Sequence, residues 1–296
     1  MPLSLRIAVA QIETAPGDLT ANHRKHLEFI AAARRARIEV LLFPELSLVG
    51  HAGSIDTLDL ALGLRDPRIA EIAAASADMC TVFGFIEEGP AAQFYNATAV
   101  VRRGRVEFVH RKINLATYGR LEEGKYYASG RSVDTFELAP GWRTSVLICA
   151  DLWNPPLVHL AAMHGATLLL SPISSAIEAV GVEFDNPGGW NINVRFYAMI
   201  YGMPIAIANR VGHEGGLTFW GGSRILDPFG HTLVEAEDAV EQLITAELDY
   251  SALRRARYLL PTVRDSNVSL IERELARLSR APSVLDAAST PSAIPH

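Results

Sequence analysis

Cysteine is scarce in this sequence, and its scarcity excludes two kinds of structural support. Cys80 and Cys149 are the only cysteines among 296 residues, which is too few for a disulfide framework or for a zinc cage. The nine histidines also lack a metal-ligand spacing such as His-Glu-x-x-His. We therefore expect a fold that is held together by its apolar core, and no metal site.

Long apolar runs and clusters of one charge are also missing. No stretch is typical of a membrane span, and the net charge of −6 comes from interspersed acidic and basic residues. Neither a membrane nor a nucleic acid is therefore an expected partner. The N-terminal segment runs straight into a strand pattern, without the charged, apolar and small-residue regions of a signal peptide. We expect a cytoplasmic protein.

Apolar material is abundant, at 49% of residues, and it is arranged in two similar β-α-β patterns. Each pattern ends its second strand at a proline. Two such units predict a pseudo-symmetric α/β domain, which we place at residues 1–280, with a tail at 281–296 that is flexible or lies at an oligomer interface. The expected units are strands 6–13 and 40–43 around a helix at 20–37, and strands 144–148 and 167–170 around a helix at 157–164.

The rest of the chain predicts further strands, helices and two irregular loops. The loops at 113–130 and 183–189 lack a clean period, which is typical of ordered loops near a site. The expected helices are 67–77, 190–201 and 264–280, and the expected strands are 80–86, 95–101, 105–110, 133–138, 204–208, 223–226, 231–236 and 240–249.

Three chemically useful side chains stand at the carboxyl ends of expected strands: Glu45, Lys112 and Cys149. Sites of α/β sheets gather at such strand ends. Cys149 also sits on a sharp turn between a strand and a helix start, where free backbone amides should lower the pKa of its thiol. A cysteine can form a thioester, a glutamate can take and return a proton, and a lysine can stabilise an oxyanion.

Each of these residues also has a simpler interpretation. A cysteine at a strand end is more often a small buried apolar residue, and we keep that interpretation for Cys80. Glu45 could cap a helix or stand in a solvated turn. Lys112 follows Arg111, so the two could form a basic surface pair.

Three segments that carry these residues resemble one known family. The segments LLFPELSLVG around Glu45, HRKINL around Lys112 and LICADLWNP around Cys149 resemble the signature segments of the nitrilase superfamily, the carbon–nitrogen hydrolases. The resemblance implies a four-layer α-β-β-α sandwich and a Glu-Lys-Cys triad. It also implies a second glutamate in the loop after the lysine. Within YGRLEEGKYYASG the match is Glu123, with Glu122 in reserve.

The resemblance implies the rest of the site as well. The backbone N–H of Ala150 would help Lys112 to hold an oxyanion, and neither a metal nor an organic cofactor would be needed. We expect four further residues to shape the pocket for a small amide substrate. A homodimer or a larger homo-oligomer is also expected. The four pocket residues are Tyr118, Trp153, Ser174 and Trp190.

Within the superfamily, the segments ICADLW, YGRLEEGKYYASG and IANRVG are most similar to the glutaminase domain of glutamine-dependent NAD synthetases. The Ser-Gly-Gly loop of the synthetase half does not occur in the sequence. We therefore expect a stand-alone amidase that acts on a linear amide or an N-carbamoyl group. The alternatives are a nitrilase, an acyltransferase of the same fold, a glutaminase subunit that supplies ammonia to a separate synthetase, and a non-catalytic scaffold.

Overall fold

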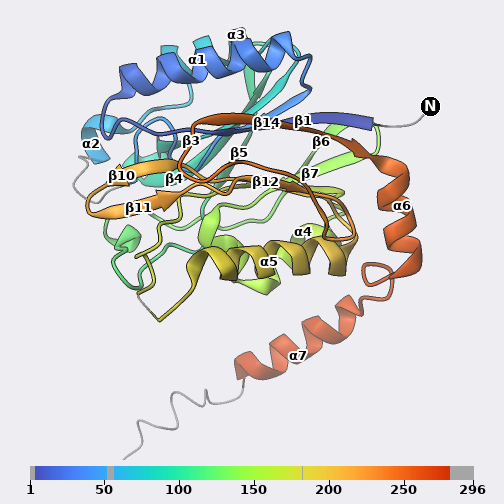
Figure 1. Cartoon of the computed structure of the whole chain (residues 1–296). Coiled ribbons are helices and arrows are strands. Elements are labelled where there is room, and N and C mark those ends of the chain that lie inside the picture. Colours follow the sequence, from blue (N-terminus) through green and yellow to red (C-terminus); the bar gives the residue numbers. More distant parts are fainter. Residues whose placement is uncertain (1–3, 52–56, 182, 281–296) are drawn as a thin grey trace, which may run out of the picture.

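The computed structural model describes residues 4–51, 57–181 and 183–280, and it contains two six-stranded sheets (Figure 1). The first sheet has the order β14-β1-β2-β3-β4-β5, and the second has the order β13-β12-β9-β8-β7-β6. The strands of the first sheet are β1 (Ser4–Gln11), β2 (Val40–Leu42), β3 (Cys80–Glu88), β4 (Phe94–Arg102), β5 (Arg105–Arg111) and β14 (Gln242–Asp249). Those of the second are β6 (Thr135–Ala139), β7 (Trp142–Val146), β8 (Leu168–Pro172), β9 (Ile205–Ala208), β12 (Arg224–Leu226) and β13 (Thr232–Glu235).

The two sheets repeat one pairing pattern. Read from β14 to β5, neighbouring strands pair antiparallel, parallel, parallel, antiparallel and antiparallel. The same pattern runs from β6 to β13. The parallel connections carry the helices α1 (Leu19–Arg35), α3 (Pro67–Ser76), α4 (Pro155–Met163) and α5 (Asn186–Tyr201). The expected pair of β-α-β units is therefore present in the structure.

Side-chain alternation along the strands builds the layers. On β1, Ile7 and Val9 belong to the core between the two sheets, whereas Ala8 and Ala10 belong to the core under α1 and α3. On β8, Leu168 and Leu170 point between the sheets and Leu169 points toward α4 and α5. Because the strands are buried on both faces, their sequences read as unbroken apolar runs. The four-layer α-β-β-α sandwich is thus confirmed.

Several expected boundaries were wrong. Helix α5 begins at Asn186, four residues earlier than expected, because Asp185 accepts a hydrogen bond from the N–H of Gly188 at 3.0 Å and caps the first turn. The stretch directly after β14 also forms a helix that we did not expect, α6 (Tyr250–Leu259). The last helix, α7 (Val268–Arg280), starts four residues later than the expected 264.

A small hairpin was also missed, formed by β10 (Val211–Glu214) and β11 (Leu217–Trp220). Its turn is the pair Gly215 and Gly216, both with positive φ, of 57° and 74°. Two consecutive residues with positive φ make a tight hairpin turn that favours glycine. The Gly-Gly pair was therefore a hairpin signal.

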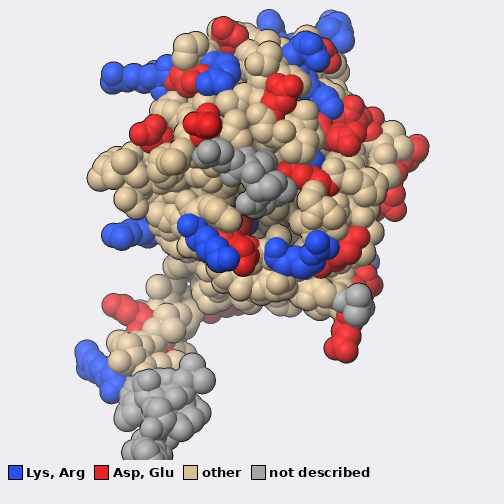
Figure 2. Space-filling view, turned by 90° about the vertical axis from the view of Figure 1, so that its left-hand side faces the viewer, with Lys and Arg blue, Asp and Glu red and all other residues tan. Residues whose placement is uncertain are grey.

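On the face shown in Figure 2, acidic and basic side chains are mixed, and neither sign of charge dominates. No helix within the described ranges is long and apolar enough to span a membrane.

Helix α7 lies away from the four layers (Figure 1) and has no buried residue. The expected tail at 281–296 lies outside the described residues. The short remaining elements are α2 (Thr57–Leu60) and the 3₁₀ turns η1 (Pro90–Ala92), η2 (Glu123–Lys125) and η3 (Cys149–Trp153).

Candidate active site

Cys149 stands on a strained turn between β7 and α4. Its φ of 44° lies in the left-handed region, which a non-glycine residue adopts only where the surrounding structure imposes it. The residue opens η3, and Ala150 follows it as the second residue of that turn, where backbone N–H groups have no intrahelical partner. The elbow predicted from the sequence is therefore present, with a 3₁₀ turn between it and α4.

Glu45 lies just beyond β2, and the adjacent strand β3 holds its backbone in place. The N–H of Glu45 donates to the carbonyl of Ile173 at 3.3 Å, which ties this segment to the second sheet. Gly84 of β3 packs so closely that a Cβ at this position would lie 2.2 Å from the backbone nitrogen of Leu46. Only glycine permits that approach, and it brings the carboxylate of Glu45 to the junction of the two sheets.

Four side chains form a buried charged cluster beside this junction. The ammonium of Lys112 donates to Glu45 Oε1 at 2.6 Å and lies 2.8 Å from Glu123 Oε2. Asn96 donates from Nδ2 to Glu45 Oε1 at 2.8 Å and to Glu123 Oε1 at 3.0 Å. Each of these residues is 5% exposed or less, so the charges interact with little solvent screening.

The two glutamates of the loop after Lys112 behave differently. Glu123 is buried, and its Oε2 accepts from the N–H of Ala116 at 2.7 Å. Glu122 is exposed and pairs with Lys125 at 2.5 Å. The structure thus places Glu123 in the cluster and leaves Glu122 in solvent.

The cluster shifts the protonation of its own members. Burial favours the neutral acid of Glu45, but the positive charge of Lys112 and the donors around it hold the pKa of Glu45 below its ordinary value. Burial likewise opposes the charge of Lys112, but Glu123 and Glu45 raise the pKa of Lys112 well above its ordinary value. We therefore assign an ionised Glu45 and an ionised Lys112 at neutral pH.

The expected lowering of the Cys149 pKa was wrong. Burial and the nearby carboxylate of Glu45 raise the pKa of Cys149 well above that of a free thiol, and they outweigh the charge of Lys112 and the backbone N–H of Ser174. Only 8% of Cys149 is exposed. At rest Cys149 is therefore a neutral thiol that needs a base.

Asp151 connects the segment of Cys149 to the segment of Lys112. Its Oδ1 accepts from the N–H groups of Ile113 at 3.0 Å and Asn114 at 2.7 Å. Its Oδ2 accepts from the N–H of Ile148 at 3.0 Å and lies 3.0 Å from His110 Nε2. One buried carboxylate therefore sets the spacing between the residues that flank Lys112 and Cys149.

Replacing Asp151 by asparagine is expected to weaken this connection. The amide NH₂ of Asp151→Asn would oppose one of the N–H donors, and a buried donor without an acceptor costs about 1–3 kcal/mol. We expect a lower melting temperature together with a loss of turnover of at least about tenfold, since small misplacements of reacting groups are costly. Thermal unfolding and single-turnover rates measure the two effects. A variant with wild-type values in both would contradict this role.

A small cavity opens beside Cys149 and Lys112. Its volume accessible to the centre of a water molecule is about 20 Å³. Three of the four expected pocket residues, Tyr118, Trp153 and Ser174, line it. Trp190 does not: it is buried behind Trp153, with ring centroids 5.1 Å apart, and its Nε1 donates to Ser175 Oγ at 2.9 Å. The remaining lining residues are His51, Ala116, Leu121, Ser175, Ala179, Val180 and Asn186.

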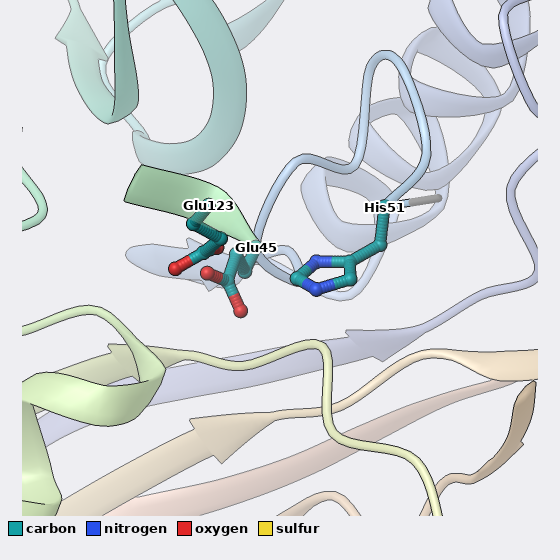
Figure 3. A group of neighbouring side chains, drawn as sticks. All are labelled: Glu45, His51 and Glu123. Atoms are coloured by element: carbon teal, nitrogen blue, oxygen red, sulfur yellow. The ribbon is translucent and has the colours of Figure 1, made fainter. Parts of the chain in front are cut away.

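Sequence reasoning missed Asn96 and His51. Asn96 lies inside an apolar strand, and it faces Glu45 only because β4 pairs with β3 in the register that puts Asn96 opposite Ile86. No local signal marks it. His51 lies six residues after Glu45 and points toward Glu45 and Glu123 in Figure 3. The position of His51 directly after the signature segment of Glu45 was the available signal.

The carboxylates of Glu45 and Glu123 and the imidazole of His51 also form a potential ligand set for a cation. One ligand atom from each lies within 4.8 Å of the others (Figure 3). However, the ammonium of Lys112 already donates to both carboxylates. A metal ion would have to share these oxygens with a covalently attached cation, so the donor set fits a proton-transfer site better than a metal site.

Comparison with known proteins identifies relatives along most of the chain. Residues 6–258 match the family model described as carbon-nitrogen hydrolase. A glutamine-dependent NAD(+) synthetase of Thermotoga maritima is 30% identical over 266 residues, which is 88% of this chain and 45% of that protein. A protein of Pseudomonas protegens described as a hydrolase in the pqqF 5′ region is 27% identical, with 91% of each chain covered.

The fold has close counterparts as well. A mutant of an amidase from Nesterenkonia AN1, a member of the nitrilase superfamily, superimposes with a TM-score of 0.76 at 24% identity, over 91% of this chain and 96% of that chain. The chain spans about half the length of the NAD synthetases that it matches. The resemblance seen in the three signature segments is thus confirmed: this chain belongs to the carbon-nitrogen hydrolase family, the nitrilase superfamily, and is an enzyme of that family.

Proposed function

We propose that the chain hydrolyses a linear amide or an N-carbamoyl compound through a thioester on Cys149. One observation carries the proposal: a buried thiol, the ammonium of Lys112 and the carboxylate of Glu45 meet beside a single cavity. A thiol with a raised pKa requires a base at the moment of attack, and Glu45, which is ionised, supplies one.

In the acylation step the sulfur of Cys149 attacks the amide carbonyl while Glu45 takes the thiol proton. The carbonyl oxygen becomes an oxyanion, which Lys112 and the backbone N–H of Ala150 stabilise. The carbon–nitrogen bond then breaks, and Glu45 returns the proton to the departing nitrogen. A thioester and a free amine or ammonia result. Glu123 keeps Lys112 in place through its own ion pair.

In the deacylation step a water molecule attacks the thioester. Glu45 again takes a proton, the oxyanion forms at the same position, and the sulfur of Cys149 leaves and recovers a proton. The products are a carboxylic acid, or a carbamic acid from an N-carbamoyl compound, and the original thiol. No redox change occurs, so atoms and charges balance with water as the second substrate.

The cavity favours an uncharged acyl group. Among the described residues that line it, Lys112 is the only lysine or arginine, and its ammonium is already paired with two carboxylates. A free α-carboxylate such as that of glutamine would lack a cationic partner there. We therefore place a simple amide before glutamine, although a glutaminase subunit remains the second candidate because the chain matches half of glutamine-dependent synthetases.

A substrate panel tests the proposal. Primary amides, N-carbamoyl compounds, nitriles and glutamine are assayed for released ammonia, and hydroxylamine is added to detect acyl transfer. We expect turnover of uncharged amides and a much lower rate with glutamine. A preference for glutamine that increases with an added synthetase would support the second candidate. Turnover of nitriles alone would reject both.

We also propose that the chain forms a homodimer through α5. Three apolar side chains on successive turns of that helix are exposed: Ile192 by 72%, Phe196 by 49% and Met199 by 50%. Such a row is typical of a helix that packs on a partner. Light scattering should give twice the chain mass, and Ile192→Glu should reduce it to one chain by burying a charge at the interface. A wild-type monomer would reject this assembly.

A further inference from the structure

Several buried polar atoms around this site have no hydrogen-bond partner among the described residues, including Ser174 Oγ in the wall of the cavity. Two of them are acceptors that face the site, Glu45 Oε2 and His51 Nδ1. The other carboxylate oxygen of Glu45 is fully used, since it accepts from both Lys112 and Asn96. Buried polar atoms are nearly always hydrogen bonded, so both atoms call for a partner that the described part of the chain does not provide.

The spacing fits one small molecule with several N–H or O–H donors. Ligand atoms of Glu45, His51 and Glu123 lie within 4.8 Å of one another, and the imidazole points at both carboxylates (Figure 3). Two hydrogen bonds of normal length that meet at one tetrahedral nitrogen or oxygen separate their acceptors by about 4.7 Å. Ammonia and water both satisfy this geometry.

His51 is held firmly enough to act as such an acceptor. Its backbone N–H donates to Glu214 Oε1 at 2.9 Å, and Glu214 is in turn paired with the buried Arg210. The imidazole packs edge-on against Phe219, with ring centroids 6.2 Å apart. The side chain also lines the cavity that contains Cys149. In its Nε2–H tautomer, Nδ1 accepts a hydrogen bond.

We propose that Glu45 and His51 form a binding site for the leaving nitrogen, shaped for ammonia and then for the hydrolytic water. This inference rests on the proposed function and specifies its substrate class as primary amides. The departing NH₃ donates to these acceptors after the carbon–nitrogen bond breaks. An N-alkyl group on the leaving nitrogen would meet the His51 ring, which lines the cavity. His51 thus selects the leaving group.

The experiment compares propionamide with N-methylpropionamide. The wild-type protein should prefer the primary amide by at least about 100-fold in kcat/KM, because the methyl group clashes. His51→Ala should reduce this ratio at least about tenfold, by opening space and removing the acceptor. His51→Gln keeps an acceptor and most of the bulk, so its ratio should stay near that of the wild type. His213, exposed on β10, provides the matched control His213→Ala with an unchanged ratio.

The outcomes separate this inference from the proposed function. Acyl-enzyme on Cys149 is measured by mass spectrometry after quenching, in the same reactions. If the thioester forms but the ratio is the same in His51→Ala and wild type, His51 does not select the leaving group and the inference fails alone. If no thioester forms with any amide, the proposed function fails and the inference fails with it.

Discussion

The Cys149→Ala protein is expected to fold as the wild type does and to lose amide turnover by about 10⁴-fold or more, because no thioester can form. The loss should appear in kcat, since the remaining cavity still binds substrate. Alanine retains the small volume of the site, so the melting temperature should change little. Ammonia release measures the first effect and thermal unfolding the second. Turnover within tenfold of the wild type would exclude the thioester route.

Cys80 provides the matched control for this experiment. It is buried in β3, and burial raises the pKa of its thiol to about 12. The carboxylate that acts on it, Glu107, is already paired with Arg102 at 2.8 Å. Cys80→Ala should therefore keep its turnover, and the mass of an acyl adduct should be found on Cys149 in that variant. An adduct on Cys80 in the wild type would contradict the assignment of the nucleophile.

The residues that could be predicted from the sequence are those that stand at strand ends. Glu45, Lys112 and Cys149 each follow an expected strand, and strands that run in the same direction bring their carboxyl ends to one edge. Their contact across two sheets follows from the pseudo-symmetric pairing, which the repeated β-α-β pattern predicted. Glu123 was chosen over Glu122 by resemblance alone, and its burial distinguishes the two.

What the sequence could not predict depends on contacts between distant segments. Asn96 reaches Glu45 through the register of β3 and β4, which no local pattern encodes. The pKa of Cys149 is raised by burial and by a carboxylate from the other sheet, whereas sequence reasoning considered only the local turn. Trp190 and Trp153 read alike as aromatic residues, yet one packs behind the other. Local chemistry was thus predictable and long-range electrostatics was not.

The Lys112→Met protein is expected to lose both activity and stability. Lys112 is the ammonium that separates two buried carboxylates, and removing one partner of a buried ion pair costs about 3–5 kcal/mol. Methionine preserves the length of the side chain, so packing changes little. Amide turnover should fall by at least about 10²-fold, the effect of losing one oxyanion donor. Urea unfolding at neutral pH measures the loss of stability.

The pH dependence of that loss has a definite sign. In the wild type the pKa of Glu45 is held below its ordinary value, so its contribution to stability is present at neutral pH and is lost as the pH falls through the folded-state pKa. Without Lys112, burial dominates and raises the pKa of Glu45 above that of the unfolded chain. The folded state then binds more protons than the unfolded state. The variant should therefore gain stability as the pH falls, opposite to the contribution of Glu45 in the wild type.

A combined variant tests whether uncompensated charge is the cause. Adding Glu45→Gln and Glu123→Gln to Lys112→Met removes all three charges but keeps oxygens that can accept from Asn96. Neutral groups of similar shape can replace a buried ion network at little cost, so stability at neutral pH should largely return while turnover stays lost. Urea unfolding at about pH 5 and about pH 8 compares the three proteins. If the combined variant is no more stable than Lys112→Met, lost packing rather than unpaired charge explains the lower stability. Lys112 would then not stabilise the fold by compensating the charges of Glu45 and Glu123.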